Sequence, residues 1–194
     1  MKTDIILAGV GGQGILSIAT IIGSAALEQG LYLKQAEVHG MSQRGGDVQS
    51  NLRLSSAPIF SDLIPKGSAD LIVSLEPMEA LRYVPWLAPD GWIITNTTPL
   101  VNIPNYPEMD KVMEELNRFP QVLALDVDSI AKDLGNARGA NMVLLGAMSA
   151  ALHILDPEKL REGIRRIFGR KGEAVVASNI KAFDEGLFRF QNRK

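Results

Sequence analysis

The chain has 194 residues, of which 46% are hydrophobic and 22% are charged, a composition that predicts a globular protein with enough length for one hydrophobic core. Its formal net charge of -2 gives no overall basic field, which argues against nucleic acid or an anionic membrane as the main partner. The absence of cysteine excludes disulfides, a cysteine-ligated iron–sulfur cluster and a thiol nucleophile within this sequence. The longest apolar run, Met142–Leu152, is shorter than the roughly 20 residues that span a bilayer, and the first residues lack the features of a signal peptide. We therefore expect a soluble, cytoplasmic protein with a single domain over residues 1–194.

The first elements are a strand, a glycine turn and a helix. Residues 4–10 are a short apolar run, residues 9–14 read GVGGQG, and residues 15–30 have a helical pattern that stops at Gly30. A second strand is predicted at 31–38. The first crossover is therefore expected to be a right-handed parallel βαβ unit.

The following strands differ in how many polar residues they carry. Residues 48–54 alternate, with Leu52 and Leu54 on one face and Asn51 and Arg53 on the other, which suggests an antiparallel or edge strand. Continuous apolar runs predict three further strands, buried between helices. These strands are predicted at 70–75, 92–97 and 122–127, and the helices between them at about 77–88 and 108–118.

From about residue 138 the pattern is wholly helical. Asp156 and Pro157 are suited to the N-cap and first turn of one helix. Another helix carries an apolar stripe, which we expect to be buried because such a row in water promotes aggregation. The stripe consists of Val176, Ile180, Phe183, Leu187 and Phe190. Together these elements predict an α/β fold: a three-layer α/β/α, Rossmann-like domain with a mostly parallel sheet, at least one antiparallel strand and a helical C-terminal part.

Two glycine-rich loops are expected at one edge of this sheet. Because the carboxyl ends of parallel strands lie at the same edge, the turn GVGGQG and the loop HGMSQRGG (39–46) should share one crevice. The free N–H groups at the start of the first helix favour a phosphate or carboxylate. Arg44 is suited to hold such an anion through two hydrogen bonds. The proline-rich segment 96–107 follows another strand at this edge and is a candidate for a further wall.

Other interpretations of the glycine turn remain open. Gly9, Gly11 and Gly14 fit the G-x-G-x-x-G pattern, with Glu37 about 20 residues further on. That pattern would indicate a stand-alone NAD- or FAD-binding Rossmann-type oxidoreductase. The same glycines could also serve tight packing between strand and helix, without any ligand.

The histidines and one basic cluster have simpler explanations. His39 could simply cap the end of a strand, without a role in binding. His153 is expected in the core or at its boundary. The basic cluster lies near a predicted helix C-terminus and is typical of a solvated face. It consists of Arg165, Arg166, Arg170 and Lys171.

Four segments together resemble a known family. They read GVGGQGI (9–15), EVHGMSQRGGDVQSNLRL (37–54), GNARGANMVLLGA (135–147) and NIKAFDEGL (179–187). They resemble the gamma-type domain of the 2-oxoacid:ferredoxin oxidoreductases over nearly the whole chain. Within that superfamily, the short chain and its HGMSQRGG loop are most similar to the beta subunits of indolepyruvate ferredoxin oxidoreductases.

The resemblance implies a role in the oxidative decarboxylation of an arylpyruvate, typically indolepyruvate, to an acyl-coenzyme A with ferredoxin as electron acceptor. Thiamine diphosphate, magnesium and the iron–sulfur clusters would belong to a large alpha subunit, and this chain would be its partner in a hetero-oligomer. The chain itself would supply no catalytic residue and no metal site. It would contribute coenzyme A or anion binding and part of the subunit interface.

The resemblance and the predicted crevice together give a set of candidate binding residues. The glycine turn contributes Gly9, Gly11, Gly12, Gln13 and Gly14, and the facing loop contributes His39, Ser42, Gln43 and Arg44. The facing loop would contact either coenzyme A or the partner subunit.

Overall fold

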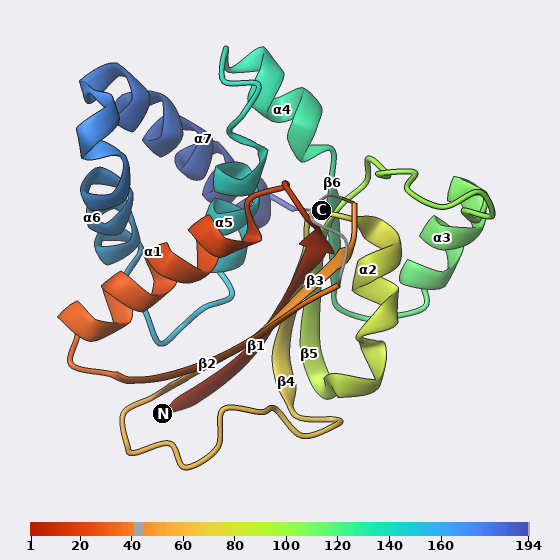
Figure 1. Cartoon of the computed structure of the whole chain (residues 1–194), viewed down its shortest axis with the longest axis horizontal. Helices are drawn as coiled ribbons and strands as arrows, with labels where there is room; N and C mark the ends of the chain where they lie inside the picture. The colour runs from red at the N-terminus through yellow and green to blue at the C-terminus, as the bar shows by residue number, and fades with distance from the viewer. Residues whose placement is uncertain (41–44, 194) are drawn as a thin grey trace.

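The computed structural model describes residues 1–40 and 45–193 of the chain. A six-stranded sheet with the strand order β2-β3-β1-β4-β5-β6 forms its centre, and helices cover both faces (Figure 1). The strands are β1 (Lys2–Val10), β2 (Tyr32–His39), β3 (Asp47–Ser55), β4 (Ala69–Ser74), β5 (Leu87–Asn96) and β6 (Val122–Leu125). The helices are α1 (Ile15–Glu28), α2 (Pro77–Arg82), α3 (Met109–Leu116), α4 (Val127–Asp133), α5 (Ala140–Ser149), α6 (Pro157–Phe168) and α7 (Glu173–Gln191), with 3-10 turns at Val84–Trp86 and Gly169–Lys171.

Two hydrophobic clusters, one on each face of the sheet, produce three layers. Successive side chains of a strand point to opposite faces, so Ile5 and Leu7 of β1 belong to one cluster, and Ile6 and Ala8 belong to the other. The first cluster includes residues of α1, α4, α5, α6 and α7, and the second includes residues of α2 and α3. Figure 1 shows α1, α5, α6 and α7 on one side of the sheet and α2 and α3 on the other. The predicted three-layer α/β/α fold is confirmed.

The position of β3 differs from the simplest expectation. Strand β3 pairs antiparallel with both β1 and β2, whereas β1, β4, β5 and β6 pair in parallel. The connection through α1 therefore leads from β1 to a parallel strand two positions away, because β3 lies between them. The antiparallel direction predicted for 48–54 is confirmed, but the edge of the sheet is occupied by β2.

Some predicted boundaries were wrong. Strand β5 begins at Leu87 rather than at residue 92. The run 122–127 is a strand only as far as Leu125, since Asp126 is the N-cap of α4. Helix α2 ends at Arg82 rather than near residue 88. Pro85 lies in the 3-10 turn that follows, and proline has no N–H with which to continue an α-helix.

Fewer side chains of the C-terminal part are buried than the sequence predicts. Helix α5 ends at Ser149, and His153 lies exposed in the connection to α6, so its expected core or boundary position was wrong. In the apolar stripe of α7, Phe183 and Phe190 are buried. The other stripe residues, Val176, Ile180 and Leu187, are only partly buried. Helix α7 instead meets α5 most closely at Gly186, which lies against the backbone of Val143.

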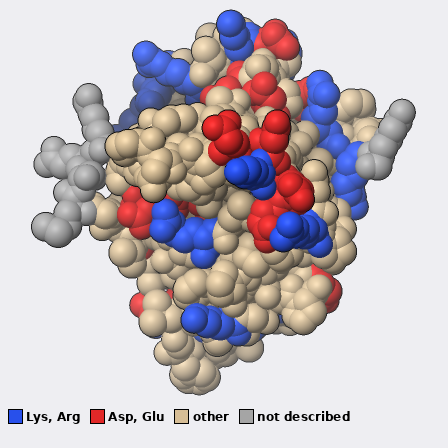
Figure 2. Space-filling model, turned by 90° about the vertical axis from the view of Figure 1, so that its right-hand side faces the viewer, with Lys and Arg blue, Asp and Glu red and all other residues tan. Residues whose placement is uncertain are grey.

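The surface carries charges of both signs. Figure 2 shows a face on which lysine and arginine side chains are interspersed with aspartate and glutamate, and neither sign dominates. In residues 1–40 and 45–193, no helix is both long and apolar enough to cross a membrane.

We expect the Asp126→Ala variant to lose about 1 kcal/mol of folding free energy at pH 7 through loss of the α4 N-cap. The Asp126 carboxylate accepts hydrogen bonds from the Ser129 N–H at 2.9 Å and from the Thr98 hydroxyl at 3.1 Å. The backbone N–H of Ser129 is the main cause of a lowered pKa of Asp126, followed by hydrogen bonds from the hydroxyls of Ser129 and Thr98. A lowered pKa stabilises the fold above the ordinary aspartate pKa of about 4, and this stabilisation is lost as the pH falls through the folded-state value. The cost of the substitution should therefore shrink between pH 5 and about pH 3.

Urea denaturation at several pH values measures this difference. Asp126→Asn is the matched control, because its side-chain oxygen can still cap the helix. An Asp126→Ala cost that is the same at pH 7 and pH 3 would contradict the role of the carboxylate charge.

Candidate functional site

The turn between β1 and α1 is held by the side chain of Gln13. Its Oε1 accepts a hydrogen bond from the Val10 N–H at 2.7 Å, and its Nε2 donates to the carbonyl oxygen of Leu75 at 3.0 Å. Gln13 therefore joins the ends of β1 and β4. Gly12 and Gly14 have φ angles of 104° and 91°, in a region that favours glycine.

Gly14 also marks a close approach between the turn and α5. The Asn141 Nδ2 donates to the Gly14 carbonyl oxygen at 3.3 Å, and a Cβ atom at Gly14 would lie only 2.6 Å from that nitrogen. Asn141 is buried at the start of α5. The glycine turn is thereby fixed against an element far away in the sequence.

A crevice of about 780 Å³ opens beside this turn. Its walls come from the glycine turn, from the ends of β4 and β5, from α4 and the connection to α5, and from the turn between α6 and α7. Its polar lining consists of Gln13, Ser17, Asn96, Asp128, Asn136, Arg138, Asn141, Lys171 and Asn179. The volume falls in the range of small-molecule sites, roughly 300–1,000 Å³.

The amide side chains of the crevice mainly hold its walls together. The Nδ2 of buried Asn96 donates to Asp128 Oδ2 at 2.7 Å and to the Leu75 carbonyl oxygen at 3.3 Å. The Asn136 Nδ2 donates to Asn179 Oδ1 at 3.3 Å. These bonds tie α4, α7 and the strand ends into one frame around the cavity.

The charges of the crevice favour an anion. Arg138 and Lys171 are exposed cations in its lining, whereas Asp128 is the single acid there and is hydrogen-bonded to Asn96. The N-terminus of α1 adds the partial positive charge of the helix dipole. The crevice therefore combines two cationic side chains with backbone N–H groups that suit phosphate or carboxylate oxygens.

A smaller cavity of about 300 Å³ lies on the other side of the glycine turn. It is lined by Val10, Gly11, Gly12, Gly14, Ile15, Leu16, His39 and Val48. The Gly11 N–H donates to the Gly46 carbonyl oxygen at 2.8 Å, so the two glycine loops do lie side by side. The His39 Nε2 contacts the Glu37 carboxylate. The lining of this cavity is mostly apolar, whereas most polar side chains near the glycine turn line the 780 Å³ crevice.

The predicted site residues are thus divided between two cavities. Gly12 and Gly14 line both, Gln13 lines the crevice, and Gly11 and His39 line the smaller cavity. Gly9 lies buried within β1 and appears in the lining of neither. Ser42, Gln43 and Arg44 lie outside the described residues.

Sequence reasoning missed the far wall of the crevice. Asn136, Arg138 and Asn141 belong to the segment GNARGAN, which the sequence marked only through its family resemblance, and Lys171 was expected on a solvated basic face. The combination of an arginine with several glycines and asparagines just before an apolar helix was the available signal. In the described part of the chain, no group of three or more His, Asp or Glu side chains could hold a metal ion.

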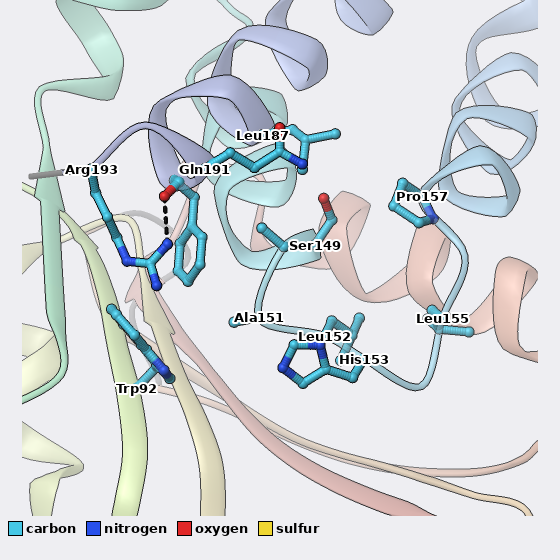
Figure 3. Close-up of a pocket in the computed structure, with 12 residues that line it drawn as sticks. Trp92, Ser149, Ala151, Leu152, His153, Leu155, Pro157, Leu187, Gln191 and Arg193 are labelled. Carbon is cyan, nitrogen blue, oxygen red and sulfur yellow. Dashed lines mark hydrogen bonds between the residues drawn. The ribbon is translucent and has the colours of Figure 1, made fainter.

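Another cavity, of about 570 Å³, lies at the C-terminal end of α7 (Figure 3). The guanidinium of Arg193 stacks on the rings of Phe190 and Trp92, 3.9 and 4.7 Å from their centroids. It also donates to the Phe190 carbonyl oxygen at 2.6 Å. This cavity shares no lining residue with the two cavities at the glycine turn, so it is separate from the candidate site.

Known proteins match this chain over nearly its whole length. Residues 4–188 match the family model described as pyruvate ferredoxin/flavodoxin oxidoreductase. The chain is 37% identical to indolepyruvate oxidoreductase subunit IorB of Pyrococcus horikoshii, over 95% of this chain and 94% of that protein. The gamma subunit of a keto/oxoacid ferredoxin oxidoreductase from Geobacter sulfurreducens is 27% identical, with a TM-score of 0.70 over 97% of this chain and 98% of that one.

A longer protein contains the same fold. The 2-oxoglutarate:ferredoxin oxidoreductase of Magnetococcus marinus, solved with 2-oxoglutarate, coenzyme A and succinyl-CoA bound, is 25% identical with a TM-score of 0.79. The match covers 100% of this chain and 32% of that chain. Since both the family model and relatives above 30% identity span nearly its whole length, the chain belongs to the pyruvate ferredoxin/flavodoxin oxidoreductase family, as predicted from the sequence.

Proposed function

We propose that the chain is the small, single-domain subunit of an oxidoreductase that converts an arylpyruvate, typically indolepyruvate, to its acyl-coenzyme A and passes the electrons to ferredoxin. The observation that carries this proposal is the full-length similarity, at 34–37% identity, to four indolepyruvate oxidoreductase subunits. Thiamine diphosphate, magnesium and iron–sulfur clusters are assigned to a large partner subunit. This division suits a chain without cysteine, because cysteine thiolates are the usual ligands of such clusters.

Coenzyme A is the ligand proposed for the crevice. It carries a diphosphate and a ribose phosphate, which suit the N-terminus of α1 and the cations Arg138 and Lys171. The Magnetococcus marinus relative was solved with coenzyme A bound, which supports the proposal. Ser42, Gln43 and Arg44 stay predicted to face either this ligand or the partner subunit.

The alternative, a stand-alone NAD- or FAD-binding oxidoreductase, is disfavoured by the position of Glu37. In the dinucleotide pattern, the acidic residue lies at the end of the strand next to the glycine turn and binds a ribose. Here β3 separates β2 from β1, which places Glu37 one further strand spacing, about 4.8 Å, from β1. Glu37 lines neither cavity at the glycine turn, and Gln35 and His39 contact its carboxylate.

We expect the purified chain alone to reduce neither ferredoxin nor a viologen dye with indolepyruvate and coenzyme A. Decarboxylation of a 2-oxoacid needs an electron sink for the developing carbanion, which thiamine diphosphate provides and side chains do not. Addition of a matching large subunit should produce reduction that depends on both indolepyruvate and coenzyme A. Activity of the lone chain, or hydride transfer to NAD by it, would reject the subunit proposal.

Arg138→Ala should raise the KM for coenzyme A in the reconstituted complex about tenfold, which corresponds to about 1.4 kcal/mol of binding. An exposed guanidinium that binds a phosphate is expected to contribute about this amount. Arg189→Ala is the matched control, because Arg189 lies on α7 and pairs at 2.7 Å with Glu185 away from the crevice. An unchanged KM for Arg138→Ala would place coenzyme A elsewhere.

A further inference from the structure

The segment 97–108, between β5 and α3, is anchored to the buried carboxylate of Glu76. Glu76 follows β4, is 1% exposed and is the N-cap of α2, where its Oε2 accepts from the Glu79 N–H at 2.8 Å. The other oxygen, Oε1, accepts a hydrogen bond from the Tyr106 hydroxyl, and the Leu100 N–H approaches it at 3.4 Å. A carboxylate this deeply buried requires such donors, because an unpaired buried charge is very costly.

The same segment reaches the end of the loop that faces the glycine turn. The Asn102 Nδ2 donates to the carbonyl oxygen of Gly45 at 2.7 Å. The next carbonyl, that of Gly46, accepts from the Gly11 N–H at 2.8 Å. A continuous path therefore leads from Glu76 through the 97–108 segment to the first residue of the glycine turn.

Tyr106 is suited to a permanent role as donor in this path. Burial, followed by the hydrogen bond to Glu76 and the negative charge of that residue, raises the pKa of Tyr106 well above its ordinary value. The raised pKa favours the protonated hydroxyl, which is the form that donates to Glu76. Its bond to Glu76 is long-range in sequence, so the local chain does not enforce it.

We propose that Tyr106 and Glu76 are positioning residues that, through Asn102, fix the Gly11 N–H and hence the orientation of the glycine turn. The effect on ligand binding rests on the proposed function. The effect on the turn does not, because it concerns only contacts within this chain. The two can therefore be tested separately.

Amide hydrogen exchange of the isolated chain tests the positioning directly. In Tyr106→Phe and in Asn102→Ala, the Gly11 amide should exchange at least tenfold faster. The global unfolding midpoint should stay near that of the wild type in Asn102→Ala, whereas Tyr106→Phe should lower it, because the buried Glu76 carboxylate loses one of its donors. The two changes should not add in the double variant, since both interrupt one path. Asn105→Ala is the matched control, because Asn105 is an exposed asparagine of the same segment. If Tyr106→Phe does not fold, Asn102→Ala decides, because Asn102 is exposed at the surface.

The reconstituted complex provides the second measurement. Tyr106→Phe should raise the KM for coenzyme A about tenfold with kcat within twofold of the wild type. Unchanged Gly11 exchange in Tyr106→Phe and Asn102→Ala, or an equal increase in Asn105→Ala, would overturn the proposal. If the wild-type complex does not bind coenzyme A, the proposed function fails, and the exchange result still decides whether the path positions the turn.

Discussion

Gly146→Ala should lower the free energy of unfolding, and so destabilise the protein, by about 3 kcal/mol or more. Alanine in a helix normally has the opposite effect and stabilises it relative to glycine by about 1 kcal/mol. The reason is the contact between α5 and α7. A Cβ atom at Gly146 would lie 1.8 Å from the Phe183 carbonyl oxygen, and one at Gly186 would lie 1.8 Å from the Val143 carbonyl oxygen. Backbone atoms cannot move aside as a flexible side chain can, so the two helices would have to separate. Gly186→Ala should have a similar effect.

Chemical denaturation measures both changes. Gly169→Ala is the control, since Gly169 has a φ of -54° and a Cβ atom added there would have no neighbour within 4 Å. The stability of this control should stay within about 1 kcal/mol of the wild type. A stable Gly146→Ala protein would show that α5 and α7 lie further apart than their backbone contacts indicate.

Arg53→Met should destabilise the chain by about 3 kcal/mol, because it leaves a buried carboxylate without its main partner. The Asp4 side chain is fully buried, and Arg53 donates to its two oxygens at 2.8 and 3.1 Å. The Nη1 of Arg53 also donates to the carbonyl oxygens of Ser61 and Leu63, at 3.1 and 2.9 Å. Lys2 lies 2.8 Å from Asp4 but is half exposed, so it compensates only in part.

The double variant Asp4→Leu/Arg53→Met separates the pair from its surroundings. Removal of both charges should restore much of the lost stability, since apolar replacements of a buried ion pair are often neutral. Arg118→Met is the surface control and should cost under about 1 kcal/mol, because Arg118 pairs with exposed Glu115. Equal losses in Arg53→Met and Arg118→Met would contradict the buried role of Arg53.

The sequence by itself determined which segments form strands and where the glycine turn lies. Continuous apolar runs such as 70–75 indicate strands that are buried on both faces of the sheet. Side chains of β4 indeed belong to the hydrophobic clusters on both faces. The glycines at 12 and 14 report a backbone with positive φ, which the turn has. Both signals are local, so a single segment is enough to read them.

The environment of β3 was decided only by the tertiary structure. Its alternation predicted one polar face, but Asn51 is buried there and Arg53 is mostly buried, because the segment after β3 covers them. The Ile64 N–H donates to Asn51 Oδ1 at 3.3 Å, and the Ser61 and Leu63 carbonyls accept from Arg53. Alternation shows that a face is polar. It carries no information on whether the polar side chains of that face form hydrogen bonds with water or with backbone groups.

The candidate site depends even more on long-range packing. The sequence identified the glycine turn, yet the cations that face it in the crevice, Arg138 and Lys171, come from the connection before α5 and the turn before α7. They line the same crevice as Gly14 because α5 packs against α1 and α7 and because Asn141 bonds to the turn. No local pattern specifies which distant loops meet at the edge of a sheet, since this follows from the packing of whole helices. The sequence therefore determined one wall of the crevice, and the folded chain decided the others.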